Sequence, residues 1–135
     1  MDSKDQFAPR PHDPFDDSAV ERQRRMGLLT EQGGVDHRAL SAFCSIHAGL
    51  FFDDLLDYCT DAKMARAICR QLLELSVQED ARRVLLALSM QYDAMNHTLP
   101  DPVWWIVGSS VLLPPFIEGF MHQLAELANE LSEVV

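Results

Sequence analysis

The sequence predicts an all-α protein, a single-domain bundle of five or six short helices. Apolar residues recur at intervals of three and four in four separate segments, as they do along one side of a helix. No stretch of useful length alternates apolar with polar residues, as a half-buried strand would. The chain has 135 residues, 47% of them apolar, which is typical of one folded domain with a buried core.

The first 17 residues are the exception to this pattern. They contain three prolines and five aspartates, and besides Met1 their only large apolar side chains are Phe7 and Phe15. Such a segment buries too little apolar surface to offset the entropy that is lost on ordering it. We therefore expect a disordered, mobile Pro/Asp-rich tail at residues 1–17 and a helical domain at residues 18–135.

Capping residues place the first two helices. Ser18 and Glu21 match a capping box, which predicts a short helix that ends before Gly33. Asp36 can cap the next helix, because its carboxylate can accept a hydrogen bond from an early backbone amide. That helix has a broad apolar arc over residues 40–58, so we expect it to be the central helix of the bundle.

The next two helices are expected to meet at a very tight turn. Thr60 or Asp61 begins an amphipathic helix. A second capping box, formed by Ser76 and Glu79, restarts the helix register in the following segment. Residues 96–100 end that segment with a polar break and a proline.

Prolines mark the last two predicted helices. Asp101 and Pro102 supply a cap and a first-turn proline for an apolar helix over residues 103–113, which Pro114 and Pro115 end. Pro115 also opens the last helix, whose apolar row comprises Phe116, Phe120, Leu124, Leu127 and Leu131. The helices together predict a core of Phe43, Phe51, Leu55, Ile68, Leu72, Leu85, Leu88, Tyr92, Trp104, Phe120 and Leu124.

Cysteine content and hydropathy predict a cytoplasmic protein. The three cysteines are an odd number and lie inside apolar stretches, so we expect reduced thiols. The first residues are charged and lack the apolar run of a secretory signal. The longest stretch without charged residues, residues 102–117, is shorter than the ~20 residues that a membrane-spanning helix needs. We expect no contact with a membrane.

Charge is the strongest functional signal. The chain has 11 Lys and Arg against 21 Asp and Glu, a net charge of -10, which excludes direct nucleic-acid binding through a basic face. Residues 100–135 contain no Lys or Arg, and the acids near the end of the last helix oppose the helix dipole. A basic partner would offset this unfavourable interaction between the acids and the dipole. The candidate partner-binding residues on this helix are Glu118, His122, Glu126, Glu130 and Glu133.

Two other interpretations of this acidic row stay open. It can be an ordinary solvated helix surface, or a carboxylate and an imidazole four residues apart can chelate a metal ion. We predict no metal site and no cofactor, because the ExxH spacing of di-iron bundles and the clustered cysteines and histidines of zinc sites are missing.

The adjacent Trp104 and Trp105 are the second candidate contact. Their side chains point about 100° apart on a helix, so both can be buried only between two neighbouring elements. Tryptophan is enriched at binding hot spots. Core packing of both residues and binding of a partner by at least one of them are the two alternatives.

Catalytic patterns are scarce. The sequence has no nucleophile elbow, phosphate-binding glycine loop or HExxH motif, and we predict that the chain is not an enzyme. The remaining enzymatic alternative is a buried pair of His47 and Asp54, two turns apart on the central helix. His47 can equally be a core histidine with its hydrogen bonds satisfied. Cys44 lies one turn from His47, but the two side chains point past each other.

We therefore expect a small acidic interaction protein, namely an adaptor, regulator, inhibitor or specific chaperone that binds a protein with a basic surface. One alternative is an acidic inhibitor that mimics nucleic acid and blocks a DNA- or RNA-handling enzyme. The other is the small helical enzyme with His47 and Asp54. The large apolar surface of the last helix also predicts a homodimer formed partly by that helix.

Overall fold

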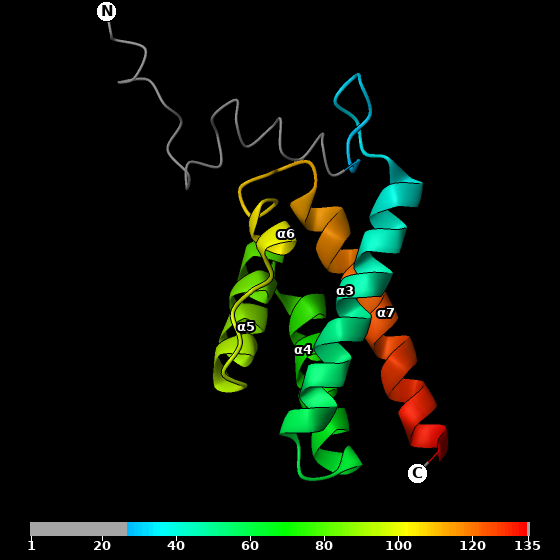
Figure 1. Ribbon diagram of the computed structural model, residues 1–135, viewed down its shortest axis with the longest axis vertical. Helices are drawn as coiled ribbons and strands as arrows, with labels where there is room; N and C mark the ends of the chain where they lie inside the picture. Colours follow the sequence, from blue (N-terminus) through cyan, green and yellow to red (C-terminus); the bar gives the residue numbers. More distant parts are fainter. Residues whose placement is uncertain (1–26, 135) are drawn as a thin grey trace, which may run out of the picture.

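The computed structural model describes residues 27–134, with side chains described up to residue 131. The helices are α3 (His37–Tyr58), α4 (Ala62–Gln78), α5 (Ala81–Ala94), α6 (Asp101–Trp104) and α7 (Leu113–Val134), as Figure 1 shows. Within this range the only strand-like pairing is an isolated bridge between Leu29 and Val35. The predicted all-α bundle is confirmed. The predicted tail and the helix expected from Ser18 lie outside the described residues.

The bundle is organised around α7. This helix packs against α3, α4 and α5, whereas α3 packs mainly against α7. Figure 1 shows that α3 and α7 run side by side in the same direction. The prediction that α3 is the central helix is therefore wrong. The reason is that α7 buries two neighbouring rows of side chains, and so it can face several helices; these rows are Phe116, Phe120 and Leu124, and Ile117 and Met121.

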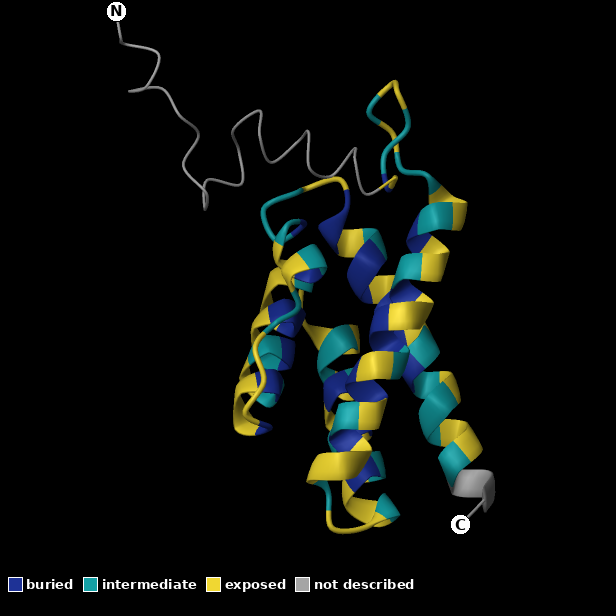
Figure 2. Cartoon of the chain, viewed as in Figure 1, coloured by how far each residue is buried: buried dark blue, intermediate teal, exposed yellow. Residues whose placement is uncertain are grey.

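The core is one continuous apolar cluster on the inner sides of the long helices (Figure 2). Phe51 links three of them, because its ring centroid lies 5.2 Å from Tyr92 in α5 and 5.7 Å from Phe120 in α7. Such tilted aromatic pairs add to the stabilisation from area burial. Of the predicted core residues, Phe43 and Ile68 are partly buried and Trp104 is 48% exposed, while the others are buried.

Two of the predicted helix caps are confirmed. The Asp36 carboxylate accepts a hydrogen bond from the Ala39 amide over 3.1 Å and begins α3. The Asp61 carboxylate accepts from the Met64 amide over 2.8 Å and begins α4. Both aspartates satisfy an amide that has no partner inside its own helix.

The predicted cap Ser76 is wrong. Ser76 lies inside α4, where its hydroxyl donates to the Leu73 carbonyl over 2.7 Å. Asp80 caps α5 instead, since its carboxylate accepts from the Arg83 amide over 3.0 Å. The turn between α4 and α5 is as tight as predicted, because only Glu79 and Asp80 separate the two helices.

The segment after α5 also differs from the prediction. The expected helix over residues 103–113 is replaced by one helical turn, α6, and a series of turns. The predicted cap Asp101 is wrong as well, because Asp101 is the first residue inside α6 and Pro100 takes the cap position without a side-chain hydrogen bond. The Ser109 hydroxyl accepts from the Leu112 amide over 3.0 Å just before α7 begins. Pro114 and Pro115 lie in the first turn of α7 and do not end a preceding helix. Proline is well tolerated there, because first-turn amides have no partner within the helix.

Within the described residues, α3 alone has the length and apolar composition that would allow a helix to cross a membrane. The core helix of a soluble protein can have the same length and apolar composition. Seven side chains of α3 are buried in the bundle, and α3 packs mainly against α7.

Candidate interaction surfaces

The predicted acidic residues form an exposed line along α7. We use the term acidic row for Glu118, His122, Glu126 and Glu130, all of which are exposed. His122 Nε2 lies 3.4 Å from Glu126 Oε2, one helical turn away, and both side chains are more than half exposed. The Glu133 side chain lies outside the described residues. The periodicity of α7 thus predicted the position of the row correctly.

No basic side chain neutralises the acidic row within the described part of the chain. The ion pairs there are His122 with Glu126 and His97 with Asp54, and neither involves a lysine or an arginine. The sequence contains no Lys or Arg after Arg83. Among the described residues, the exposed imidazole of His122 is therefore the one ion-pair partner of the carboxylates of the row.

A groove of about 520 Å³ runs between α3 and α7 beside the start of the acidic row. His37 and Ser41 of α3 lie on one side of it, and Glu118 and His122 of α7 on the other. Its remaining lining residues are Leu40, Cys44, Pro115, Gly119 and Gln123. We call it the α3–α7 groove. The acidic row therefore lies beside a groove, which the helical periodicity of the sequence did not predict.

Metal binding by the row finds no support in this geometry. Among the described residues, no group of three or more histidine, cysteine, aspartate or glutamate side chains is arranged so that it could hold a metal ion. His122 and Glu126 are a pair without a third ligand.

Cys44 lines the α3–α7 groove without the properties of a nucleophile. Its thiol donates a hydrogen bond to the Phe116 carbonyl over 3.5 Å. Burial raises the pKa of the Cys44 thiol to about 11, so the thiol stays protonated at neutral pH. The hydrogen-bond partner of the Cys44 thiol is thus a backbone carbonyl and not the His47 imidazole.

His47 is buried in a mostly apolar environment. Its ring centroid lies 4.4 Å from that of Phe43, and its Nδ1 atom has no hydrogen-bond partner among the residues that the structure describes. Burial lowers the pKa of His47, because the charged imidazolium would lose its hydration. The expected core location is confirmed, whereas the expected full set of hydrogen bonds is not present.

Asp54 pairs with a different histidine from the one considered in the sequence. Its Oδ1 atom lies 4.0 Å from Nε2 of His97, which follows α5. The ion pairs of the described residues do not include His47 with Asp54. Sequence spacing offered no signal for the pair of Asp54 and His97, because the two residues are far apart along the chain.

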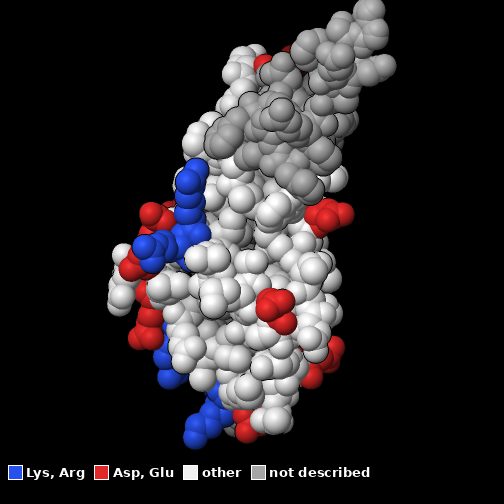
Figure 3. Space-filling model, turned by 90° about the vertical axis from the view of Figure 1, so that its left-hand side faces the viewer, with Lys and Arg blue, Asp and Glu red and all other residues white. Residues whose placement is uncertain are grey.

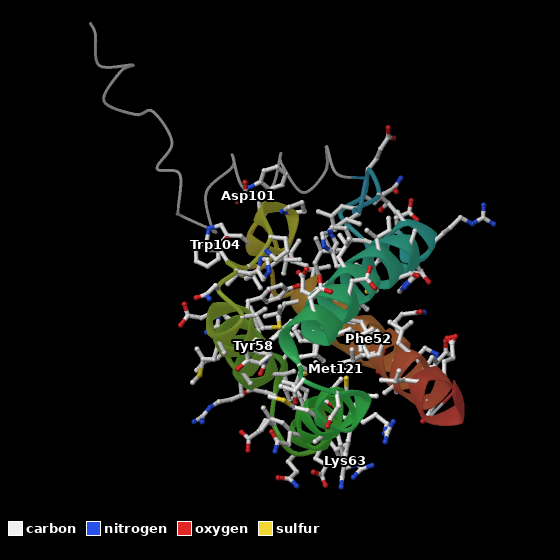
Figure 4. The ribbon with its side chains drawn as sticks, turned by 60° about the horizontal axis from the view of Figure 1, so that its bottom comes forward. Phe52, Tyr58, Lys63, Asp101, Trp104 and Met121 are labelled. Carbon is white, nitrogen blue, oxygen red and sulfur yellow. The ribbon has the colours of Figure 1, made fainter. Side chains whose placement is uncertain are left out.

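The two tryptophans have different environments. Trp104, the last residue of α6, is 48% exposed and lies at the outer edge of the bundle (Figure 4), whereas Trp105 is half-buried. Trp104 lines a second groove, of about 360 Å³, along α5. We call it the α5 groove; its lining comprises Arg82, Leu85, Leu86, Ser89, Leu99, Trp104, Val107 and Gly108. The predicted partner-binding residues therefore belong to two separate surfaces.

No protein-family model matches this chain, and searches of curated proteins and of solved structures found no similar protein. Function is therefore inferred from the two surfaces described above.

Proposed function

We propose that this chain is a small cytoplasmic interaction protein that binds a basic segment of a protein partner along the acidic row. The observation that carries this proposal is the exposure of Glu118, Glu126 and Glu130 on a helix without a single Lys or Arg. The protein acts by occupying a surface of its partner, as an adaptor, regulator, inhibitor or specific chaperone does, and not by catalysis.

Electrostatic attraction favours a basic partner both before the two proteins touch and once they are in contact. The net charge of -10 attracts a basic protein before contact, which raises the association rate at low salt. At contact, Glu126 and Glu130 lie in the second half of α7, towards the negative end of its dipole. Only Glu130 lies within about one turn of the helix end, where the dipole disfavours a carboxylate, and a partner lysine or arginine offsets that effect.

The α3–α7 groove makes this surface more than a charged helix. It lies beside Glu118 and His122, so a side chain from a bound segment can enter it while flanking basic residues pair with the row. Ser41 and Gln123 line the same groove and can form hydrogen bonds with a polar group there. Shape and charge thus favour the same occupant, a basic segment with one inserted side chain.

The test compares two variants that lose equal charge. The first replaces Glu118, Glu126, Glu130 and Glu133 by glutamine. The control replaces the exposed acids Asp53, Asp57, Glu74 and Glu79 by asparagine or glutamine. Both changes reduce the net charge from -10 to -6. Each protein serves as bait in affinity capture from the source cytosol at about 0.05, 0.15 and 0.5 M salt, a range over which the Debye length shortens about threefold.

We expect the wild type and the control to retain the same basic protein, less of it as salt rises, and the α7 variant to lose it. Equal capture by all three baits at every salt concentration would contradict the proposal and leave the row as a solvated surface. A captured protein that is released by added duplex DNA or RNA would favour the narrower interpretation, an inhibitor that mimics nucleic acid.

A further inference from the structure

The outer side of α5 carries an unpartnered stripe of four side chains. Arg82, Leu86, Met90 and Asp93 recur at intervals of four, four and three residues, which places them on one side of the helix. All four are exposed; Leu86 is 59% and Met90 65% accessible. We call these residues the α5 stripe. Two apolar side chains occupy its middle, and opposite charges occupy its ends.

The stripe borders the α5 groove. Arg82 and Leu86 belong to both, and the inner wall of the groove is apolar, formed by Leu85, Leu99 and Val107. Figure 3 shows this side of the molecule, where the charged side chains are scattered around a wide uncharged area. Exposed apolar side chains beside an apolar groove are typical of a protein–protein contact.

The charged ends of the stripe cannot neutralise each other within one chain. Arg82 and Asp93 are 11 residues apart on a straight helix, a separation of about 16 Å along its axis. Neither side chain takes part in an ion pair with another described residue. A second helix that carries an acid opposite Arg82 and a base opposite Asp93 would complement both ends.

We propose that this second helix is α5 of another copy of the chain, antiparallel to the first about a twofold axis at the level of Leu88. This arrangement places Arg82 opposite Asp93 of the second copy, and Asp93 opposite its Arg82. Leu86 meets Met90 of the second copy, whose unbranched side chain is flexible enough to enter the α5 groove beside Trp104. The contact is self-complementary, as a twofold interface requires.

The location differs from that expected from sequence. A homodimer through the last helix was predicted, but Phe116 and Phe120 of α7 are buried in the core of the single chain, and Leu127 and Leu131 are packed against it. The α5 stripe retains its apolar surface for a partner. The acidic row lies on another helix, so a dimer through α5 and binding of a basic partner do not exclude each other.

The first test measures molar mass by light scattering from about 5 to 500 µM, a range chosen around the weak affinities of small interfaces. We expect the wild type to reach twice its 15.3 kDa, and Leu86→Asp to stay at the mass of one chain. Val77→Asp is the matched control, because Val77 is 86% exposed at the end of α4 and lies outside the stripe. It should dimerise as the wild type does.

The second test exchanges the charges. Arg82→Asp or Asp93→Arg alone turns both interchain attractions into repulsions, and each should raise the dimer dissociation constant about tenfold or more. The double variant R82D/D93R restores opposite charges across the interface and should recover most of the affinity. Both changes suit the fold, since an acid near the α5 N-terminus and a base near its C-terminus favour the helix dipole.

Three outcomes would overturn the proposal. The wild type could remain a single chain at every concentration, which leaves the stripe to another kind of partner. A dimer could survive Leu86→Asp, which places the contact elsewhere. Finally, the double variant could dimerise no better than the single ones while its circular dichroism matches the wild type, which excludes the antiparallel pairing of Arg82 and Asp93.

Discussion

The sulfur of Cys44 in α3 lies directly over Gly119 in α7, so close that a β-carbon on Gly119 would stand 2.7 Å from it. At the same point of contact, the Cys44 thiol donates a hydrogen bond to the Phe116 carbonyl. The two helices can approach each other closely there because Gly119 of α7 has no side chain. Cys44 and Gly119 both line the α3–α7 groove, so this close contact is part of the groove itself.

Gly119→Ala should therefore destabilise the protein. The added methyl group must displace Cys44, which costs about 1–3 kcal/mol in a packed interior, and the higher helix propensity of alanine returns only part of that. We expect the free energy of unfolding in urea to fall by about 1–2 kcal/mol. The loss should shrink in a Cys44→Ala background, where the sulfur is absent.

Gly49→Ala is the matched control, because Gly49 lies within α3 and a β-carbon at this position would have no neighbouring atom within 4 Å. This change should raise the free energy of unfolding by about 0.5–1 kcal/mol through helix propensity alone. If the two substitutions had the same effect, the contact between Cys44 and Gly119 would carry no steric constraint.

Stability should decrease as the solution is acidified, because of His47. Its pKa is lowered by burial, so below about pH 6.5 an unfolded chain binds a proton at this residue while the folded chain does not. The free energy of unfolding therefore falls from about pH 6.5 downward until the folded imidazole also becomes protonated. Urea titrations between about pH 7.5 and 5, on a roughly half-unit grid, measure this slope.

His47→Phe should flatten that part of the profile, since it removes the titrating group and keeps a ring beside Phe43. Circular dichroism of the variant at about pH 7.5 should match that of the wild type, so that a flatter profile reports the lost imidazole and not a changed fold. A profile that is as steep in His47→Phe as in the wild type would assign the acid sensitivity to other groups.

The three thiols should react with an alkylating reagent in a defined order. Burial raises the pKa of Cys44 to about 11 and, with a contribution from Cys59, that of Cys69 to about 12. Cys59 is only half-buried, although burial and Asp61 raise its pKa as well. Mass spectrometry of the native protein at about pH 8 should show Cys59 modified first. Modification of Cys44 or Cys69 at the same rate would indicate that the bundle opens easily.

The boundary between α4 and α5 predicts a contrast between two short polar residues. Asp80→Ala removes the carboxylate that accepts from the Arg83 amide and should cost about 1 kcal/mol. Ser76→Ala removes only a hydroxyl inside α4 and should change stability by less than about 0.5 kcal/mol. Thermal unfolding separates them, since about 1 kcal/mol shifts the melting temperature by about 3–5 °C at this size. The reverse ranking would restore Ser76 as the cap.

This contrast shows which structural features could be predicted from sequence. Asp36 and Asp61 were recognisable as caps because capping depends on a few adjacent residues. Ser76 carried the same local signature, but Asp80 competes for the same turn, and α4 extends past Ser76. Local patterns identified the long helices α3, α4, α5 and α7, and competition between neighbouring patterns determined where α4 ends and α5 begins.

The candidate surfaces also combine features that local sequence predicts with features that it does not. Helical periodicity was sufficient to place Glu118, His122 and Glu126 on an exposed side of α7. The α3–α7 groove and the pair of Asp54 and His97 depend on which helices become neighbours, and no local pattern encodes that. Trp104 illustrates the same limit, because it is as apolar as a core residue, yet the single turn of α6 leaves it at the surface.

The parallel pairing of α3 with α7 also sets an order of events during synthesis. Parallel neighbours cannot be joined by a short turn, so α4, α5 and α6 all emerge from the ribosome before α7 can reach α3. Until α7 arrives, the buried side of α3 lacks its main packing partner, although Phe51 can already contact Tyr92 of α5. The nascent chain is therefore most exposed to aggregation just before its last helix arrives.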